Sequence, residues 1–345
     1  MRKRITLKVL AEETGFHVTT VSGVLLGRPH FDPETVRVIQ EAAKRLGYVP
    51  DPMLSALAAY RTGIKKPAAG NTLACIGLGP RESLTDWGFE LVMPGIRKAA
   101  GQQGYSVEFF SAKAKGMGWK RLGDILYHRG IKGVIFAAGP DPDMEIPDAF
   151  PFGRFSVVAI EDCIVRPASI HRVMNHRTRN VVMGVERCFE SGRRRIGLAT
   201  FFDREKRQHR AETGSYLGAL AHFGLNADIP VFSPEKLVGA ELLAWHARHQ
   251  PDAVLCSHHD LADRLISARS VGVPKKTAVL HYHMVHGDEP YAGVRTQHED
   301  IGVKAADLVV AMINRWEVGL PESAIYLQVP GVWKPGATLA EKRAR

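Results

Sequence analysis

The stretch TLKVLAEETGFHVTTVSGVLLG, Thr6–Gly27, determines the architecture of the N-terminal part of the chain. The threonine at its start can cap a helix that begins at Leu7, and Gly15 can end that helix in the left-handed conformation. A second helix after the turn places three apolar residues on one face: Val18, Val21 and Leu25. Two short amphipathic helices around a turn led by glycine predict a helix-turn-helix unit.

A third helix is predicted to follow. Asp32, Pro33 and Glu34 supply its cap, a first-turn proline and a first-turn acid. Apolar residues then repeat at helical spacing, at Val36, Ile39, Ala43 and Leu46. We therefore expect a three-helix head over residues 1–50, with a protein-interaction domain as the alternative to DNA binding.

A helix-turn-helix unit places its second helix in the major groove of DNA. The exposed face of that helix is expected to present His17, Thr19, Thr20, Ser22 and Gly23. The distribution of charge supports DNA as the partner. Residues 1–66 hold 11 lysines and arginines and 6 acidic residues, which leaves half of the net +10 of the 345-residue chain in this segment. A compact basic segment joined to a body whose positive and negative charges nearly cancel favours a DNA-binding head on a regulatory body.

Composition excludes several other classes of protein. The hydrophobic fraction of 45% allows a sizeable core, and the length fits two or three domains. No apolar run is long enough to cross a bilayer and no export signal is evident, so we expect a cytoplasmic protein with no membrane partner. The 4 cysteines are widely spaced and form no CxxC pair, which disfavours disulfides and structural zinc.

After a linker over residues 61–71, short apolar runs alternate with helical stretches, which predicts parallel sheets covered by helices. The candidate strands are 72–78, 106–111, 133–138, 155–160, 195–200, 253–257 and 278–281. The candidate helices are 89–103, 119–129, 178–191, 211–223, 234–249, 258–269 and 301–315.

The N-terminal motifs resemble those of the LacI/GalR family of transcription regulators. The resemblance rests on T-V-S at 20–22, on L-G-Y-x-P at 46–50 and on the total length. It implies a helix-turn-helix head, a hinge helix and two doubly wound α/β lobes of periplasmic-binding-protein type. It also implies a homodimeric repressor of a palindromic DNA operator, modulated by a small-molecule effector, by default a carbohydrate.

The resemblance also assigns DNA contacts. The hinge helix corresponds to residues 52–59, and Leu57 to the side chain that wedges into the minor groove, with a plain dimer seam as the alternative. Gly23 stands where the family commonly has an arginine that can contact guanine, so the operator should differ from the common palindrome. The expected DNA-binding residues are Thr6, His17, Val18, Thr19, Thr20, Ser22, Gly23, His30, Tyr48 and Leu57.

The same resemblance divides the rest of the chain. The hinge helix and linker are expected to span residues 51–70. The first lobe is expected to comprise 71–160 and 289–320, and the second lobe 161–288 and 321–340. Because doubly wound sheets bind ligands at the carboxyl ends of their strands, an effector should lie between the lobes. The expected effector-binding residues are Trp87, Phe89, Glu161, Glu212, His259, Asp260, His283, Thr296 and Gln297.

Two of these residues reverse the charges of a common sugar pocket. Glu212 replaces an arginine and His283 replaces an aspartate of the family pattern. Three possibilities stay open: a chemically different ligand, a carbohydrate that is held differently, or no small effector.

No motif predicts catalysis, a cofactor or a metal. The chain has no G-x-S-x-G, no H-E-x-x-H and no phosphate-binding loop. The histidines at 258, 259, 281, 283 and 286 lack a recognised ligand spacing, so cleft lining is favoured over a metal site. We expect a regulator that is not an enzyme; a ligand-binding module without operator function and a ligand-independent repressor are the alternatives.

Overall fold

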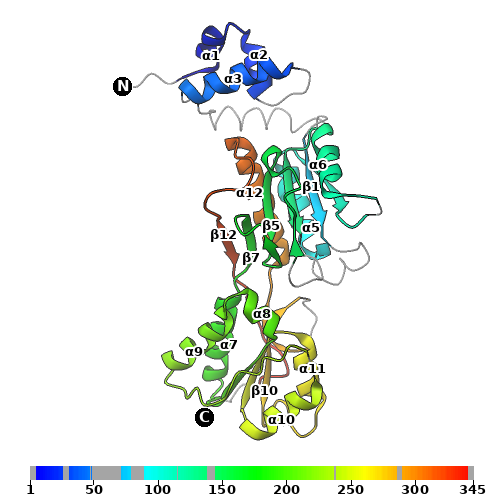
Figure 1. The fold of residues 1–345 in the computed structure, drawn as a ribbon. Helices are drawn as coiled ribbons and strands as arrows, with labels where there is room; N and C mark the ends of the chain where they lie inside the picture. The colour runs from blue at the N-terminus through cyan, green and yellow to red at the C-terminus, as the bar shows by residue number, and fades with distance from the viewer. Residues whose placement is uncertain are drawn as a thin grey trace.

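The computed structural model describes residues 5–25, 31–46, 48, 71–78, 89–114, 116–137, 144–236, 238–285 and 290–340. Three helices form the N-terminal head: α1 (Leu7–Thr14), α2 (Val18–Leu25) and α3 (Pro33–Leu46). As predicted, Thr6 caps α1, and Gly15 ends it with a φ of 72°. The head has an apolar core of its own, made by Leu10, Ala11, Val21, Val24, Ile39 and Ala42. Figure 1 shows the three helices packed together.

The first lobe is built on a parallel sheet of six strands in the order β12-β7-β5-β3-β1-β2. The strands are β1 (Thr72–Gly77), β2 (Ser106–Ser111), β3 (Gly133–Ala137), β5 (Ser156–Ile160), β7 (His171–Asn175) and β12 (Tyr326–Val329). A second, two-stranded sheet joins β4 (Met144–Glu145) to β6 (Ile164–Arg166), and the short helix η3 (Phe152–Arg154) precedes β5.

Helices cover both faces of the six-stranded sheet. Alternate residues of β1 show this, because Leu73 and Cys75 share an apolar cluster with α5 (Phe89–Gln102) and α12 (His298–Arg315). Ala74 and Ile76 face the other way, toward α6 (Trp119–His128). Strands of parallel sheets that are buried on both faces are usually rich in apolar residues, which is why β1 was recognisable in the sequence.

The second lobe has a five-stranded sheet in the order β13-β11-β10-β9-β8, in which only β13 is antiparallel to its neighbour. Its strands are β8 (Ile196–Ala199), β9 (Ala253–Cys256), β10 (Ala278–Met284), β11 (Ala292–Arg295) and β13 (Val332–Lys334). Helices α7 (Arg177–Glu190) and α9 (Ala211–His222) cover one face, and α10 (Gly239–His249) and α11 (His259–Ser267) cover the other. The short helix α8 (Phe202–Arg207) precedes α9.

The chain passes between the lobes three times: from β7 to α7, from β11 to α12 and from β12 to β13. Figure 1 shows the two lobes end to end, with β7 and α8 near their junction. These passages lie later in the chain than the sequence analysis places them, which was after residues 160, 288 and 320. The difference arises because β7, β11 and β12 were not recognised as strands.

The predicted fold class is confirmed: a three-helix head is followed by two α/β lobes. Each of the seven candidate strands and seven candidate helices overlaps an observed element of the same type. The hinge segment 51–70 lies outside the described residues. Within the part of the chain that the structure describes, no helix is both long and apolar enough to span a membrane.

Candidate DNA-binding surface and effector site

The second helix of the head, α2, is held at its start by a histidine. His17 Nδ1 lies 3.4 Å from the backbone nitrogen of Thr19 and 2.8 Å from its Oγ1. At the amino end of the helix Val18 is 37% exposed, and His17 and Thr19 are exposed as well. Thr20 and Ser22 are half-buried. The start of α2 is therefore its accessible part.

One residue of the expected DNA-binding face is placed differently. Gly23 is buried, whereas the sequence analysis put it on the exposed face. Because Gly23 has no side chain that extends beyond the helix, neighbouring residues can cover the whole residue. The predicted exposed position of Gly23 is therefore wrong, and its contact with DNA stays a prediction.

The other predicted head residues serve the head itself in this structure. Thr6 accepts a hydrogen bond from Val9 N at 3.4 Å, and Tyr48 packs on the apolar core while its N–H donates to the Ala43 carbonyl at 2.9 Å. His30 and Leu57 lie outside the described residues. The DNA contacts predicted for these residues stay predictions.

Between the lobes, a buried arginine pairs with two acids. Arg177 begins α7 in the second lobe, and Glu161 and Asp162 follow β5 in the first. The guanidinium donates to Glu161 Oε2 at 2.6 Å and to Asp162 Oδ2 at 2.9 Å. Only 9% of the arginine side chain is exposed. The first and second lobes are thus joined by ion pairs.

Position 212 belongs to the same cluster of charges. Glu212 of α9 is fully buried, and its Oε2 accepts hydrogen bonds from Tyr282 at 2.6 Å and from Thr200 at 3.4 Å. Burial lowers the pKa of Arg177, but the nearby Asp162, Glu161 and Glu212 raise it more, so the net shift is upward. The guanidinium therefore stays charged.

An asparagine links both lobes beside this cluster. Asn175 ends β7 and is fully buried; its Nδ2 donates to His283 Nδ1 at 2.8 Å and to Thr296 Oγ1 at 3.2 Å. His283 Nδ1 also lies 3.0 Å from Thr296 Oγ1. Because Nδ1 accepts from the amide, the ring proton resides on Nε2.

Three side chains of this region were not predicted from the sequence: Asn175, Arg177 and Asn180. Asn180 lies 3.2 Å from Asn175 through its Nδ2, and its Oδ1 accepts from Gly331 N at 3.0 Å. Asn175 ends a strand with a polar sequence, HRVMN, and Arg177 and Asn180 follow it, so only their position at the carboxyl end of that strand could have indicated them.

Comparison with known proteins identifies the body of the chain. The model of the family described as periplasmic binding proteins and sugar binding domain of the LacI family matches residues 76–324. The chain belongs to the LacI family. The HTH-type transcriptional regulator CelR of Thermobifida fusca is 27% identical over 342 residues, which cover 91% of this chain and 93% of CelR. The maltose regulon regulatory protein MalI of Escherichia coli K12 is 28% identical over 279 residues, 75% of this chain and 73% of MalI.

Solved structures of LacI-family proteins share the fold. A CelR–cellobiose complex covers 97% of this chain and 100% of its own with a TM-score of 0.57 at 20% identity. The lac repressor dimer bound to operator and an anti-inducer covers 98% and 100% with a TM-score of 0.56 at 17% identity. The predicted family is confirmed, and this LacI-family chain is a DNA-binding regulator of transcription.

The described contacts of two expected effector residues do not involve the buried cluster between the lobes. His259 and Asp260 begin α11 and are half exposed, and they contact each other at 3.2 Å. The His259 ring lies 4.1 Å from that of His258. One ligand atom from each of these three residues lies within 4.8 Å of the others, so the group could hold a metal ion; His259 and Asp260 are exposed and His258 is half-buried.

The remaining expected effector residues are placed as follows. Gln297 donates to the Pro330 carbonyl at 2.9 Å and so ties two of the interlobe passages together. Trp87 lies outside the described residues. Phe89 begins α5, and its side chain is not described. The structure therefore brings together Glu161, Glu212, His283 and Thr296.

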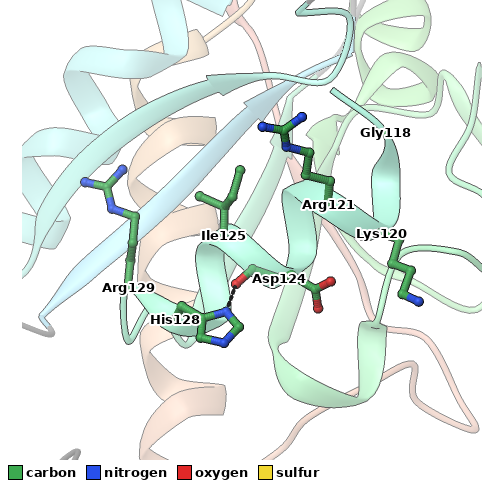
Figure 2. A pocket seen from close by; sticks show the side chains of 7 residues that line it. All are labelled: Gly118, Lys120, Arg121, Asp124, Ile125, His128 and Arg129. Carbon is green, nitrogen blue, oxygen red and sulfur yellow. Dashed lines mark hydrogen bonds between the residues drawn. The ribbon is translucent and has the colours of Figure 1, made fainter. Parts of the chain in front are cut away.

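A surface groove lies elsewhere, on α6 of the first lobe (Figure 2). It is lined by Gly118, Lys120, Arg121, Asp124, Ile125, His128 and Arg129. Two of its charged side chains are engaged by neighbours: Arg129 pairs with Glu108 at 2.7 Å, and Asp124 pairs with Arg154 at 2.9 Å. The groove is open and lies on one helix face of the first lobe, so it is a weaker candidate for a ligand site than the interlobe cluster.

Proposed function

We propose that this LacI-family protein is a cytoplasmic homodimer that represses transcription from a two-fold symmetric operator, and that a small polar effector binds between its lobes. A carbohydrate is the favoured effector class, since the matching family model describes a sugar-binding domain and a CelR structure holds cellobiose. The relatives named above are regulators, which supports a role other than catalysis.

One observation supports the effector site above the others: polar side chains from both lobes meet at the carboxyl ends of their strands. Glu161 and Asn175 follow or end strands of the first sheet, and Thr200 and Thr296 follow strands of the second. Carboxylates and a guanidinium in a protected site can form paired hydrogen bonds with neighbouring sugar hydroxyls. Arg177 here supplies the guanidinium that the family pattern places at 212.

The regulatory mechanism would be differential binding. A ligand that enters between the lobes competes for the hydrogen bonds of Glu161, Arg177 and Asn175, and so favours another arrangement of the lobes. If operator DNA prefers one arrangement, the effector changes operator affinity, and DNA changes effector affinity by the same factor.

The first test is to select bound sequences from a random DNA library at a fixed salt concentration. We expect an enriched palindrome, bound more weakly by Leu57→Ser. The palindrome is then titrated in the presence of single sugars, cellobiose included, and one sugar class should change the dissociation constant about fivefold or more.

A variant that removes one negative charge tests the proposed effector site itself. Glu212→Gln should abolish the response to the sugar and leave operator affinity without sugar unchanged. Glu186→Gln, on the exposed face of α7, is the matched control and should respond like the unaltered protein. A normal sugar response in Glu212→Gln would move the effector site elsewhere.

Ligand-independent repression is the second candidate, and one observation favours it. Several of the interlobe side chains already bond to one another: Glu161 accepts from Asn175 N at 3.1 Å and from Arg177 at 2.6 Å, and Tyr282 donates to Glu212. If no sugar alters operator binding or protects the protein against heat, this candidate replaces the effector-controlled one.

A further inference from the structure

The accessible part of α2 has an unusual chemical character for a helix that enters the major groove. The helix sequence VTTVSGVL contains neither a charged residue nor an amide. The side chains best placed to extend from it are those of Val18, which is 37% exposed, and Thr19. Gly23, which is buried, stands where the LacI family commonly has an arginine.

The hydroxyl group of Thr19 is already oriented. His17 Nδ1 accepts a hydrogen bond from Thr19 N at 3.4 Å, so this ring nitrogen is unprotonated. The hydroxyl, 2.8 Å from the same Nδ1, must then donate its proton to it. Thr19 is left with oxygen lone pairs and a methyl group, next to the two methyl groups of Val18.

Major-groove chemistry determines what such a surface can distinguish. Guanine is usually recognised by arginine or lysine and adenine by asparagine or glutamine, each through two hydrogen bonds. None of these four residue types is present in α2. Thymine is the one base that presents a methyl group in the major groove, and apolar side chains contact it.

We infer that Val18 recognises a thymine in each operator half-site by packing its methyl groups against the thymine C5-methyl group. This inference rests on the proposed operator-binding function and names the base chemistry that the head selects. Removal of one buried methyl group should weaken binding about threefold to fourfold per half-site, and about tenfold for two symmetric half-sites.

The test uses the full-length protein and the palindrome obtained by selection. Each thymine is replaced in turn by deoxyuridine, symmetrically in both half-sites, and dissociation constants are measured at one salt concentration. Deoxyuridine keeps every hydrogen-bonding group of thymine and lacks only the methyl group. One symmetric position should show the tenfold loss.

Protein variants then identify the side chain. Val18→Ala should bind the thymine and deoxyuridine operators with equal affinity. Val38→Ala, a half-buried valine on α3, is the matched control and should keep the tenfold difference. Because the deoxyuridine series is measured on the unaltered protein, a folding defect of a variant does not affect it.

Two results would overturn the inference while the operator-binding function stands. The first is equal affinity for every deoxyuridine operator, and the second is an undiminished methyl preference in Val18→Ala. If the selection enriches no sequence at all, both the operator-binding function and the thymine contact are refuted.

Discussion

At the scale of single residues, the guanidinium of Arg177 shows how the lobes are joined. It is 9% exposed and pairs with Glu161 and Asp162 across the junction. A buried ion pair adds little net stability compared with apolar residues of the same shape, but removal of one partner leaves buried charges uncompensated. Arg177 is therefore costly to replace even if its net contribution to folding is small.

Arg177→Met should lower the free energy of unfolding by about 3–5 kcal/mol, because two carboxylates lose their partner. Chemical denaturation measured by circular dichroism gives this value. Arg179→Met, at an exposed position on the same helix, should stay within about 0.5 kcal/mol of the unaltered protein. Equal effects of the two substitutions would show that the ion pairs do not form.

This residue also shows the limit of sequence reasoning. The sequence indicated Glu161 and Glu212 because motifs of the family lead to their positions, and both are found at the junction. Arg177 lies in no motif, and its partners are at least fifteen positions away along the chain. Such long-range charge pairing has no local signal, so only the structure reveals it.

At the scale of elements, the same distinction separates recognised strands from missed ones. The strand β5 (SVVAI) is apolar and buried on both faces, and its sequence alone predicts a strand. The strand β7 (HRVMN) is nearly as buried but polar, because its polar side chains make specific hydrogen bonds: His171, at its start, accepts from Ile325 N at 2.9 Å within the first lobe, and Asn175, at its end, reaches the second lobe. Because these polar side chains interrupt the run of apolar residues, a hydropathy pattern does not predict β7 as a strand.

The contact between α5 and α12 depends on two glycines. A Cβ atom on Gly302 would lie 2.1 Å from the carbonyl oxygen of Val92, and one on Gly95 would lie 1.9 Å from that of Glu299. Gly302→Ala should therefore destabilise the first lobe by about 1–3 kcal/mol, although alanine is the better helix former. Thermal unfolding followed by calorimetry measures the change.

The control for this prediction is a helical glycine with open space around it. Around Gly218 of α9, no described atom apart from the neighbouring residues and the backbone of its own helix lies within 4 Å of the position a Cβ would take. Gly218→Ala should stabilise the protein by about 0.5–1 kcal/mol. If Gly302→Ala also stabilised it, the two helices would not pack as closely as they do here.

At the scale of the whole molecule, the three passages between the lobes are tied to one another. Asn175 lies on the first passage and contacts Thr296 on the second, and Asn180 accepts from Gly331 N on the third. Main-chain bonds add to this, since His176 N donates to the Val329 carbonyl at 2.8 Å. A change of lobe arrangement must therefore involve all three passages together.

Asn175→Ala should loosen this junction without disturbing either sheet. It removes the bonds to His283 and Thr296 and costs about 1–3 kcal/mol of stability. Hydrogen exchange should become faster in peptides spanning 171–180, 292–298 and 327–333 together, while β1 and β9 keep their protection. Asn226→Ala, on an exposed loop of the second lobe, is the control and should change none of them. Faster exchange in the first passage alone would mean that the three passages open independently, and a ligand between the lobes would then have no single equilibrium to shift.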